Sequence, residues 1–83
     1  MIRECLKLTR EVLRSEGWEK QLVIHNKSDQ RDAVILVWKD SGQEVDPQLL
    51  SEEALGRAES AGQDLKVFIH KAISSLLASK GSK

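Results

Sequence analysis

The stretch AVILVWK, at residues 33–39, decides the fold that the sequence predicts. Its β-branched and aromatic side chains favour an extended strand. A strand with one face in water would alternate apolar and polar residues, whereas residues 34–38 are apolar without interruption. We therefore expect a strand covered on both faces, at the centre of a sheet.

A second strand is expected just before this one. Residues 18–25 contain Leu22, Val23 and Ile24, a short run rich in β-branched side chains. The segment between the two runs, residues 26–31, is NKSDQR, whose polar and turn-forming residues suit a hairpin loop. The two strands should therefore be antiparallel neighbours.

Helices are expected on either side of this hairpin. Apolar residues recur at spacings of three and four from residue 2 to residue 15, as in an amphipathic helix, and Gly17 supplies a stop. A second helix opens at Asp46-Pro47 or at residues 51–53, since Asp and Ser cap helices and Pro suits the first turn. It runs to about residue 61. Its inward residues are expected to be Ala54, Leu55, Ala58 and Ala61.

The C-terminal segment fits two secondary structures. Leu65, Val67 and Ile69 alternate with polar or aromatic neighbours as in a strand, and the apolar residues from 65 to 77 also fit a helix. We predict a strand at residues 65–70 and a helix at 71–79, because Gly62 is a good helix stop and a lone two-stranded hairpin is marginal in water. The alternative is one long helix from residue 64 to residue 79.

The predicted architecture is thus α/β (α+β), in the order helix-strand-strand-helix-strand-helix. It has a mixed three-stranded sheet with helices packed on it, and a right-handed crossover through residues 40–64. The alternative long helix gives the order α-β-β-α-α. The 83 residues suffice for one domain, which we place at residues 1–79, with a disordered polar tail at 80–83.

The expected location is the cytoplasm. Cys5 is the only cysteine, so no internal disulfide can form, and a reducing compartment is favoured. The N-terminus lacks the apolar core of a signal peptide, and no apolar run approaches the length of a membrane span. No membrane partner is expected.

Charge is segregated although it sums to zero, with 13 basic and 13 acidic side chains. Residues 40–64 hold seven acidic side chains and one basic, whereas residues 65–83 hold four basic and none acidic. The first helix carries a stripe of basic residues at spacings of 4, 3 and 4, here called the basic stripe. Its members are Arg3, Lys7, Arg10 and Arg14. Such a stripe suits an acidic protein partner or a nucleic-acid backbone.

No catalytic residue, cofactor site or metal site is predicted. Cys5 lies on the apolar side of the first helix, where core packing is favoured over a nucleophilic role. His25 and His70 are 45 residues apart, and no further ligands stand at a recognisable spacing. Trp18 and Trp38 are expected either to pack in the core or to anchor a protein interface.

The predicted order of elements loosely resembles the core of restriction-endonuclease-like nucleases. That resemblance implies an acid-x-Lys motif on the central strand, part of a metal-binding cluster. Lys39 ends the strand here, but Val37 stands in the place of the acid, and Asp32 and Asp40 lie at opposite ends of the strand, about 20 Å apart. An active nuclease of this type is therefore not expected.

Three functional hypotheses follow, of which an enzyme built around Cys5 or a carboxylate pair ranks last. The first is a non-enzymatic interaction module that binds a protein partner and self-associates as a homodimer. The second is a nucleic-acid-binding domain that uses the basic stripe, helped by Lys66, Lys71 and Lys80, on a degenerate restriction-endonuclease-like core.

Overall fold

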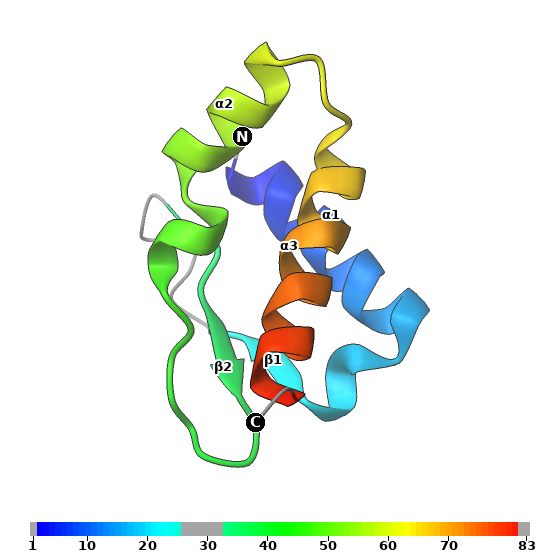
Figure 1. The fold of residues 1–83 in the computed structure, drawn as a ribbon, viewed down its shortest axis with the longest axis vertical. Helices are drawn as coiled ribbons and strands as arrows, with labels where there is room; N and C mark the ends of the chain where they lie inside the picture. The colour runs from blue at the N-terminus through cyan, green and yellow to red at the C-terminus, as the bar shows by residue number, and fades with distance from the viewer. Residues whose placement is uncertain (1, 26–32, 82–83) are drawn as a thin grey trace.

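The computed structural model describes residues 2–25 and 33–81 and contains three α-helices, two short 3₁₀ helices and a two-stranded sheet (Figure 1). The elements follow one another as α1 (Ile2–Glu16), η1 (Trp18–Lys20), β1 (Leu22–Ile24), β2 (Leu36–Trp38), η3 (Pro47–Leu50), α2 (Glu52–Ser60) and α3 (Leu65–Gly81). This is the mixed α and β class that the sequence predicts. The three-stranded sheet is not present among the described residues.

Helix α1 forms and ends as expected. Cys5, Val12 and Leu13 lie on its inner side and are almost completely buried. Thr9 is also buried, and its hydroxyl donates a hydrogen bond of 2.6 Å to the carbonyl oxygen of Cys5, so no polar atom of its side chain is left unpaired. The helix stops at Gly17, whose φ of 72° is the left-handed conformation that glycine adopts without a steric cost.

The antiparallel hairpin is confirmed, with shorter strands than predicted. Leu22 pairs with Trp38, Val23 with Val37 and Ile24 with Leu36. The predicted loop at residues 26–31 lies outside the described residues.

Of the central strand predicted at residues 34–38, only residues 36–38 form a strand, β2, and its central place in a three-stranded sheet is wrong, although most of the stretch is buried. Val34, Ile35 and Leu36 are at most 2% exposed. Their cover comes from helices and from non-strand backbone: the N–H of Val34 donates to the carbonyl of Leu50 at 2.9 Å, in η3. An uninterrupted apolar run therefore indicates that a segment is buried on all sides. Neighbouring strands are only one kind of element that can cover it.

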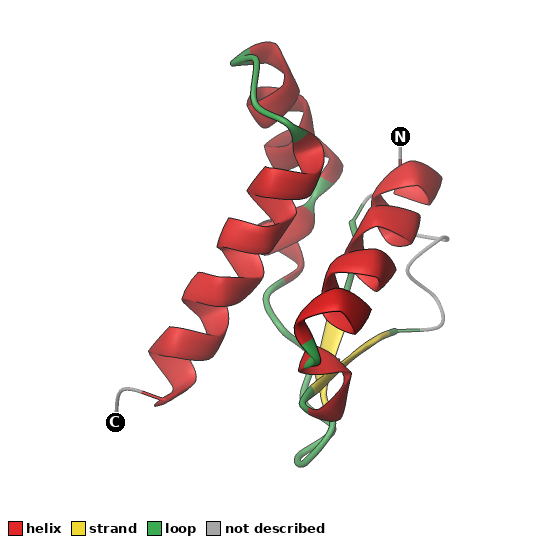
Figure 2. Ribbon diagram, turned by 90° about the vertical axis from the view of Figure 1, so that its right-hand side faces the viewer, coloured by secondary structure: helices red, strands yellow, loops and turns green. Residues whose placement is uncertain are grey.

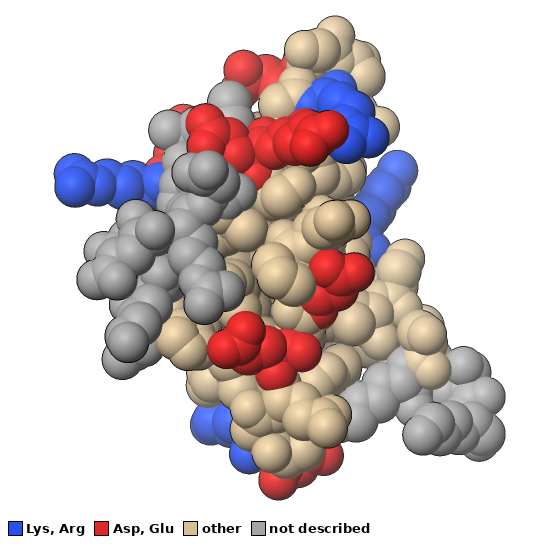
Figure 3. All heavy atoms as spheres, turned by 90° about the vertical axis from the view of Figure 1, so that its left-hand side faces the viewer, with Lys and Arg blue, Asp and Glu red and all other residues tan. Residues whose placement is uncertain are grey.

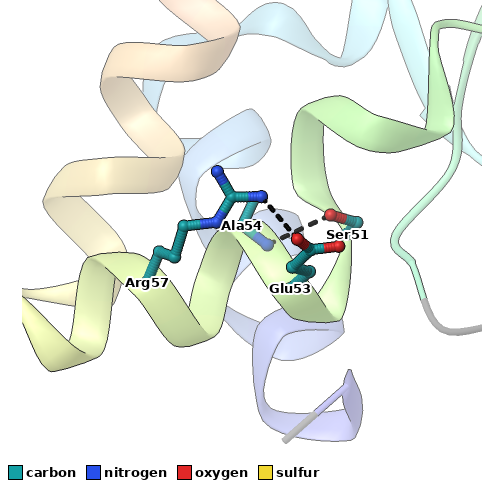
Figure 4. A network of polar contacts seen from close by, with 4 residues as sticks. All are labelled: Ser51, Glu53, Ala54 and Arg57. Carbon is teal, nitrogen blue, oxygen red and sulfur yellow. Dashed lines mark hydrogen bonds and ion pairs between the residues drawn. The ribbon is translucent and has the colours of Figure 1, made fainter.

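Both predicted helix starts are used, each by a separate helix. The Asp46 carboxylate accepts a hydrogen bond from the N–H of Gln48 and caps η3, with Pro47 as its first residue. The Ser51 hydroxyl accepts from the N–H of Ala54 at 3.1 Å and caps α2 (Figure 4). Of the residues expected to face inward on α2, Leu55 and Ala58 are buried and Ala54 is half-buried, whereas Ala61 is exposed and that part of the prediction is wrong.

The prediction of a strand at residues 65–70 is wrong, and the alternative of one long C-terminal helix is confirmed. Asp64 opens α3, because its carboxylate accepts hydrogen bonds from the N–H groups of Lys66 and Val67. Ile69 and Ile73, four residues apart, are fully buried, whereas Val67 is 52% exposed. That spacing is helical, because a strand would bury Val67 on the same side as Ile69.

Two further predictions change with this helix. The crossover to a third strand is absent, so the loose resemblance to restriction-endonuclease-like nucleases loses its structural basis. Two of the four residues expected in a polar tail, Lys80 and Gly81, belong to α3, and residues 82–83 lie outside the described part of the chain.

The core lies where α1, α3 and the inner face of the hairpin meet. Helix α3 packs against α1 on one side and against α2 and η3 on the other. Figure 2 shows α1 and α3 next to each other, with the strands behind α1. The most deeply buried side chains of this cluster are Cys5, Leu22, Leu36, Leu50, Leu55, Ile69 and Ile73. This arrangement leaves both flanks of α1 at the surface.

Candidate interaction surfaces on the two flanks of helix α1

All four residues of the basic stripe are exposed, but only part of the stripe meets another segment. Arg10 and Arg14 line a hollow of about 280 Å³ together with Lys39, which follows β2. Its floor includes Leu13 and strand β1, with Val23 37% exposed. We call this hollow the basic groove. Arg3 and Lys7 do not line it.

The basic groove carries an excess of positive charge. Glu19 is the only carboxylate in its lining, against the three cations already named. No ion pair joins any of these four side chains to another side chain in the described ranges 2–25 and 33–81. Positive charge that is not neutralised within the fold attracts carboxylates or phosphates.

A second groove, of about 450 Å³, lies on the other flank of α1, between α1 and the first turns of α3. We call it the α1–α3 groove. Val12 and Val67 supply apolar surface, and Lys66 and Lys71 lie along its α3 side. Val67 is the more exposed of the two large hydrophobic residues that reach the surface among the described residues.

One end of the α1–α3 groove is fixed by a contact between the two helices. Nε2 of His70 lies 2.7 Å from Oε1 of Glu16, which is hydrogen-bond distance. The ring of Trp18 stands 5.2 Å from the His70 ring, centroid to centroid and tilted by 40°. Trp18 is half-buried and packs against the core, so it adjoins the groove only through its contact with His70.

Trp38, the other predicted interface aromatic, is half-buried on β2 and packs against the core. Trp18 adjoins the α1–α3 groove through His70, and neither tryptophan lines the basic groove. Both tryptophan side chains pack against the hydrophobic core, which is one of the two roles expected for them from the sequence.

Acidic side chains occupy part of another face of the molecule (Figure 3). Figure 3, which looks at the side of α2 and the chain leading into it, shows Asp and Glu spread over the surface, with Lys and Arg mainly near its margins. The only salt bridge between oppositely charged residues of α2 joins Arg57 to Glu53 at 2.8 Å, and both side chains are exposed, so its effect on stability is small (Figure 4).

The side chains considered for chemistry are Cys5, His25 and His70. Burial raises the pKa of the Cys5 thiol, helped by the charge of Glu4, so the thiolate that a nucleophile needs is disfavoured. His25 lies 3.8 Å from Glu44, far from the His70 pair. Among the described residues no three His, Cys, Asp or Glu side chains come together as a metal site, and none of the helices combines the length and apolar character needed to cross a bilayer.

Sequence reasoning found half of the basic groove and missed the α1–α3 groove. Arg10 and Arg14 could be read from helical spacing, but Lys39 joins them only through the antiparallel pairing of β1 with β2, which brings Lys39 opposite Gln21. The α1–α3 groove depends on residues 65–70 being helical. A strand at residues 65–70 would instead place Val67 on the same side of the chain as Ile69.

Comparison with known protein families, with curated proteins and with solved structures found no match for this chain.

Proposed function

We propose that this protein is a non-enzymatic module that binds a protein partner through the surface around α1. The observation that carries the proposal is the convergence of Arg10, Arg14 and Lys39 on one hollow whose floor is partly apolar. Charged groups at the rim steer and orient a partner, while apolar surface between them supplies affinity. We further propose that the partner presents acidic side chains to this groove.

A nucleic acid is the alternative ligand of the same cations. A phosphate backbone is bound by rows of Lys and Arg. It gains no favourable contact from the apolar surface of Val67 on the other flank of α1. The basic stripe also alternates with Glu4 and Glu11 on the same helix, and these would face phosphates at close range. Both features favour a protein.

The test compares two charge-reversed variants of equal net charge. Arg10→Glu with Arg14→Glu inverts the basic groove, whereas Lys20→Glu with Arg57→Glu makes the same change of charge at exposed positions outside both grooves. Each protein is immobilised and exposed to nuclease-treated extract of its host cells, and retained proteins are identified by mass spectrometry.

A partner should be retained by the native protein and by the control variant, and lost with the groove variant. Retention that is seen only in a parallel extract without nuclease treatment, or that survives inversion of the groove, would contradict the proposal. A parallel titration with a generic DNA duplex at low salt separates the alternative, because backbone binding is strongest there.

A second copy of the chain is the partner we propose for self-association. The acidic face in Figure 3 is complementary in charge to the basic groove, and a two-fold pair would satisfy both contacts at once. Light scattering should then give twice the monomer mass at low salt and a lower mass at high salt. A monomer mass at every concentration and salt would remove the homodimer. We place these interactions in the cytoplasm, a reducing compartment compatible with the unpaired Cys5 thiol.

A further inference from the structure

The α1–α3 groove exposes apolar surface that the fold itself does not cover. Val12 is 2% exposed and forms part of the floor, while Val67, on the third residue of α3, keeps 52% of its surface in water. A volume of about 450 Å³ between the two helices is ample for aliphatic side chains from outside. An occupant that covered Val67 would therefore gain apolar contact without displacing any part of the chain.

The charges around this groove are of two kinds. Both carboxylates in its lining have partners: Glu16 is bound to His70 at 2.7 Å, and Asp64 accepts the first N–H groups of α3. Lys66 and Lys71 have no carboxylate within ion-pair distance among the side chains described. The two carboxylates are thus held by hydrogen bonds within the chain, whereas the two lysines on the α3 side are left without an ion-pair partner among the described residues, so a complementary occupant carries carboxylates along the edge that faces α3.

The shape of the groove favours a helix. Its two walls are α1 and the first turns of α3, two helices that pack against each other. A third helix lies naturally in the furrow between two packed helices, with its apolar row inward at an interaxial distance of about 8–10 Å. Peptides recognised in this way have apolar residues at positions i, i+3, i+4 and i+7.

We infer that the α1–α3 groove binds an amphipathic helix of a protein partner. Its aliphatic row covers Val67 and lies over the floor formed by the buried Val12, and carboxylates on one flank of the row pair with Lys66 and Lys71. This is a second contact surface, on the opposite flank of α1 from the basic groove. It does not require that Arg10 or Arg14 take part.

The probes are two designed helical peptides without tryptophan, each about 18 residues long, which is five turns. Both carry the same leucine row. One has Glu along one flank of that row and the other has Lys at the same positions. Binding is followed by the anisotropy of the labelled peptide and by the emission of Trp18, which adjoins the groove beside His70.

The Glu peptide should bind, and the Lys peptide should bind at least about tenfold more weakly. Lys66→Glu with Lys71→Glu should reverse that preference, and the Lys20→Glu with Arg57→Glu control should leave it unchanged. Val67→Asp should weaken the Glu peptide by about tenfold or more, since it places a charge in the apolar contact. Asp is tolerated in the first turn of a helix, so this variant should fold. Val67→Ala serves as a milder second variant, with circular dichroism confirming both folds.

Three results would overturn the inference: no saturable binding of the Glu peptide, equal binding of the two peptides, or affinity unaffected by both Val67 variants. Loss of Glu-peptide binding in Arg10→Glu with Arg14→Glu alone would place the peptide in the basic groove. The inference would then fail while the proposed function stood. Conversely, if the Glu peptide binds the α1–α3 groove while inversion of the basic groove changes the retention of no partner, the inference is retained and the proposed function is rejected.

Discussion

A pair of substitutions in α3 tests whether the segment that the sequence left ambiguous is a helix packed on the core. Ile69→Ala removes most of a fully buried side chain, for which the expected loss of unfolding free energy is about 2–5 kcal/mol. A chain of this length has a total stability of about 4–12 kcal/mol, so the loss is a large fraction of it. Ile69→Val, at about 0.5–1.5 kcal/mol, is the milder companion that should still fold.

Val67→Ala, by contrast, should leave the unfolding free energy almost unchanged. Val67 is 52% exposed, so deleting two carbons at about 0.8 kcal/mol each when fully buried costs roughly half of that total, about 0.8 kcal/mol. Alanine recovers up to about 0.7 kcal/mol through its higher helix propensity. The two contributions nearly cancel, and the net change should stay within about 0.5 kcal/mol. In a strand, Val67 would face inward beside Ile69 and its truncation would be costly.

Urea unfolding followed by circular dichroism and tryptophan emission measures both variants on the same scale. If residues 65–70 are helical, Ile69→Ala should lose far more unfolding free energy than Val67→Ala. The slope of the unfolding free energy against urea concentration should be the same in both variants. Equal losses, or a larger loss for Val67→Ala, would refute the packing of α3 described above.

Three further substitutions test other parts of the fold. Ser51→Ala removes the cap of α2 and should cost about 1 kcal/mol in urea unfolding, whereas Ser74→Ala on the exposed side of α3 should cost nothing measurable; equal effects would argue against the cap. Gly17→Ala should cost about 1–2 kcal/mol, because φ is 72° and no atom obstructs the added Cβ, while Gly56→Ala inside α2 should stabilise by up to about 1 kcal/mol; the same sign at both sites would contradict the geometry. Burial raises the pKa of the Cys5 thiol above its ordinary value of 9.0, so above pH 9 the unfolded chain loses this proton before the folded one, and stability should fall with rising pH in the native protein relative to Cys5→Ala. A matching pH profile in Cys5→Ala, or rapid thiol labelling of the folded protein, would show that Cys5 is not buried.

The parts of the fold set by local chemistry could be read from the sequence. Gly17 as a helix stop and the caps at Asp46 and Ser51 act within a few residues of their own position, so the pattern and the structure coincide. Pairing of the two β-branched runs was also within reach, because the chain between them is short and polar.

Residues 65–70 could not be decided locally, because their apolar side chains match both a period of two and a period of 3.6. Tertiary packing favours the helix, because Ile69 and Ile73 meet the core together from one helical face. The cap at Asp64 is a local signal for the same helix that the sequence prediction did not use. The exposure of Val67 could not be predicted for the same reason, because it depends on residues 65–70 being helical. Lys39 could not be joined to the basic stripe either, since strand register decides which end of the hairpin lies beside α1.

The most direct test of the proposed function observes the groove arginines themselves. In a ¹⁵N-labelled sample the Nε–H groups of Arg10 and Arg14 give side-chain signals, which can be assigned with the single Arg→Lys variants and followed during titration with a short Glu-rich peptide. The account predicts that these two signals and the amide of Lys39 shift together and saturate, while the Nε–H signal of Arg57 on α2 stays in place. Uniform small shifts of all arginines, or saturation only with a DNA duplex, would contradict the claim that α1 presents a binding surface for an acidic protein.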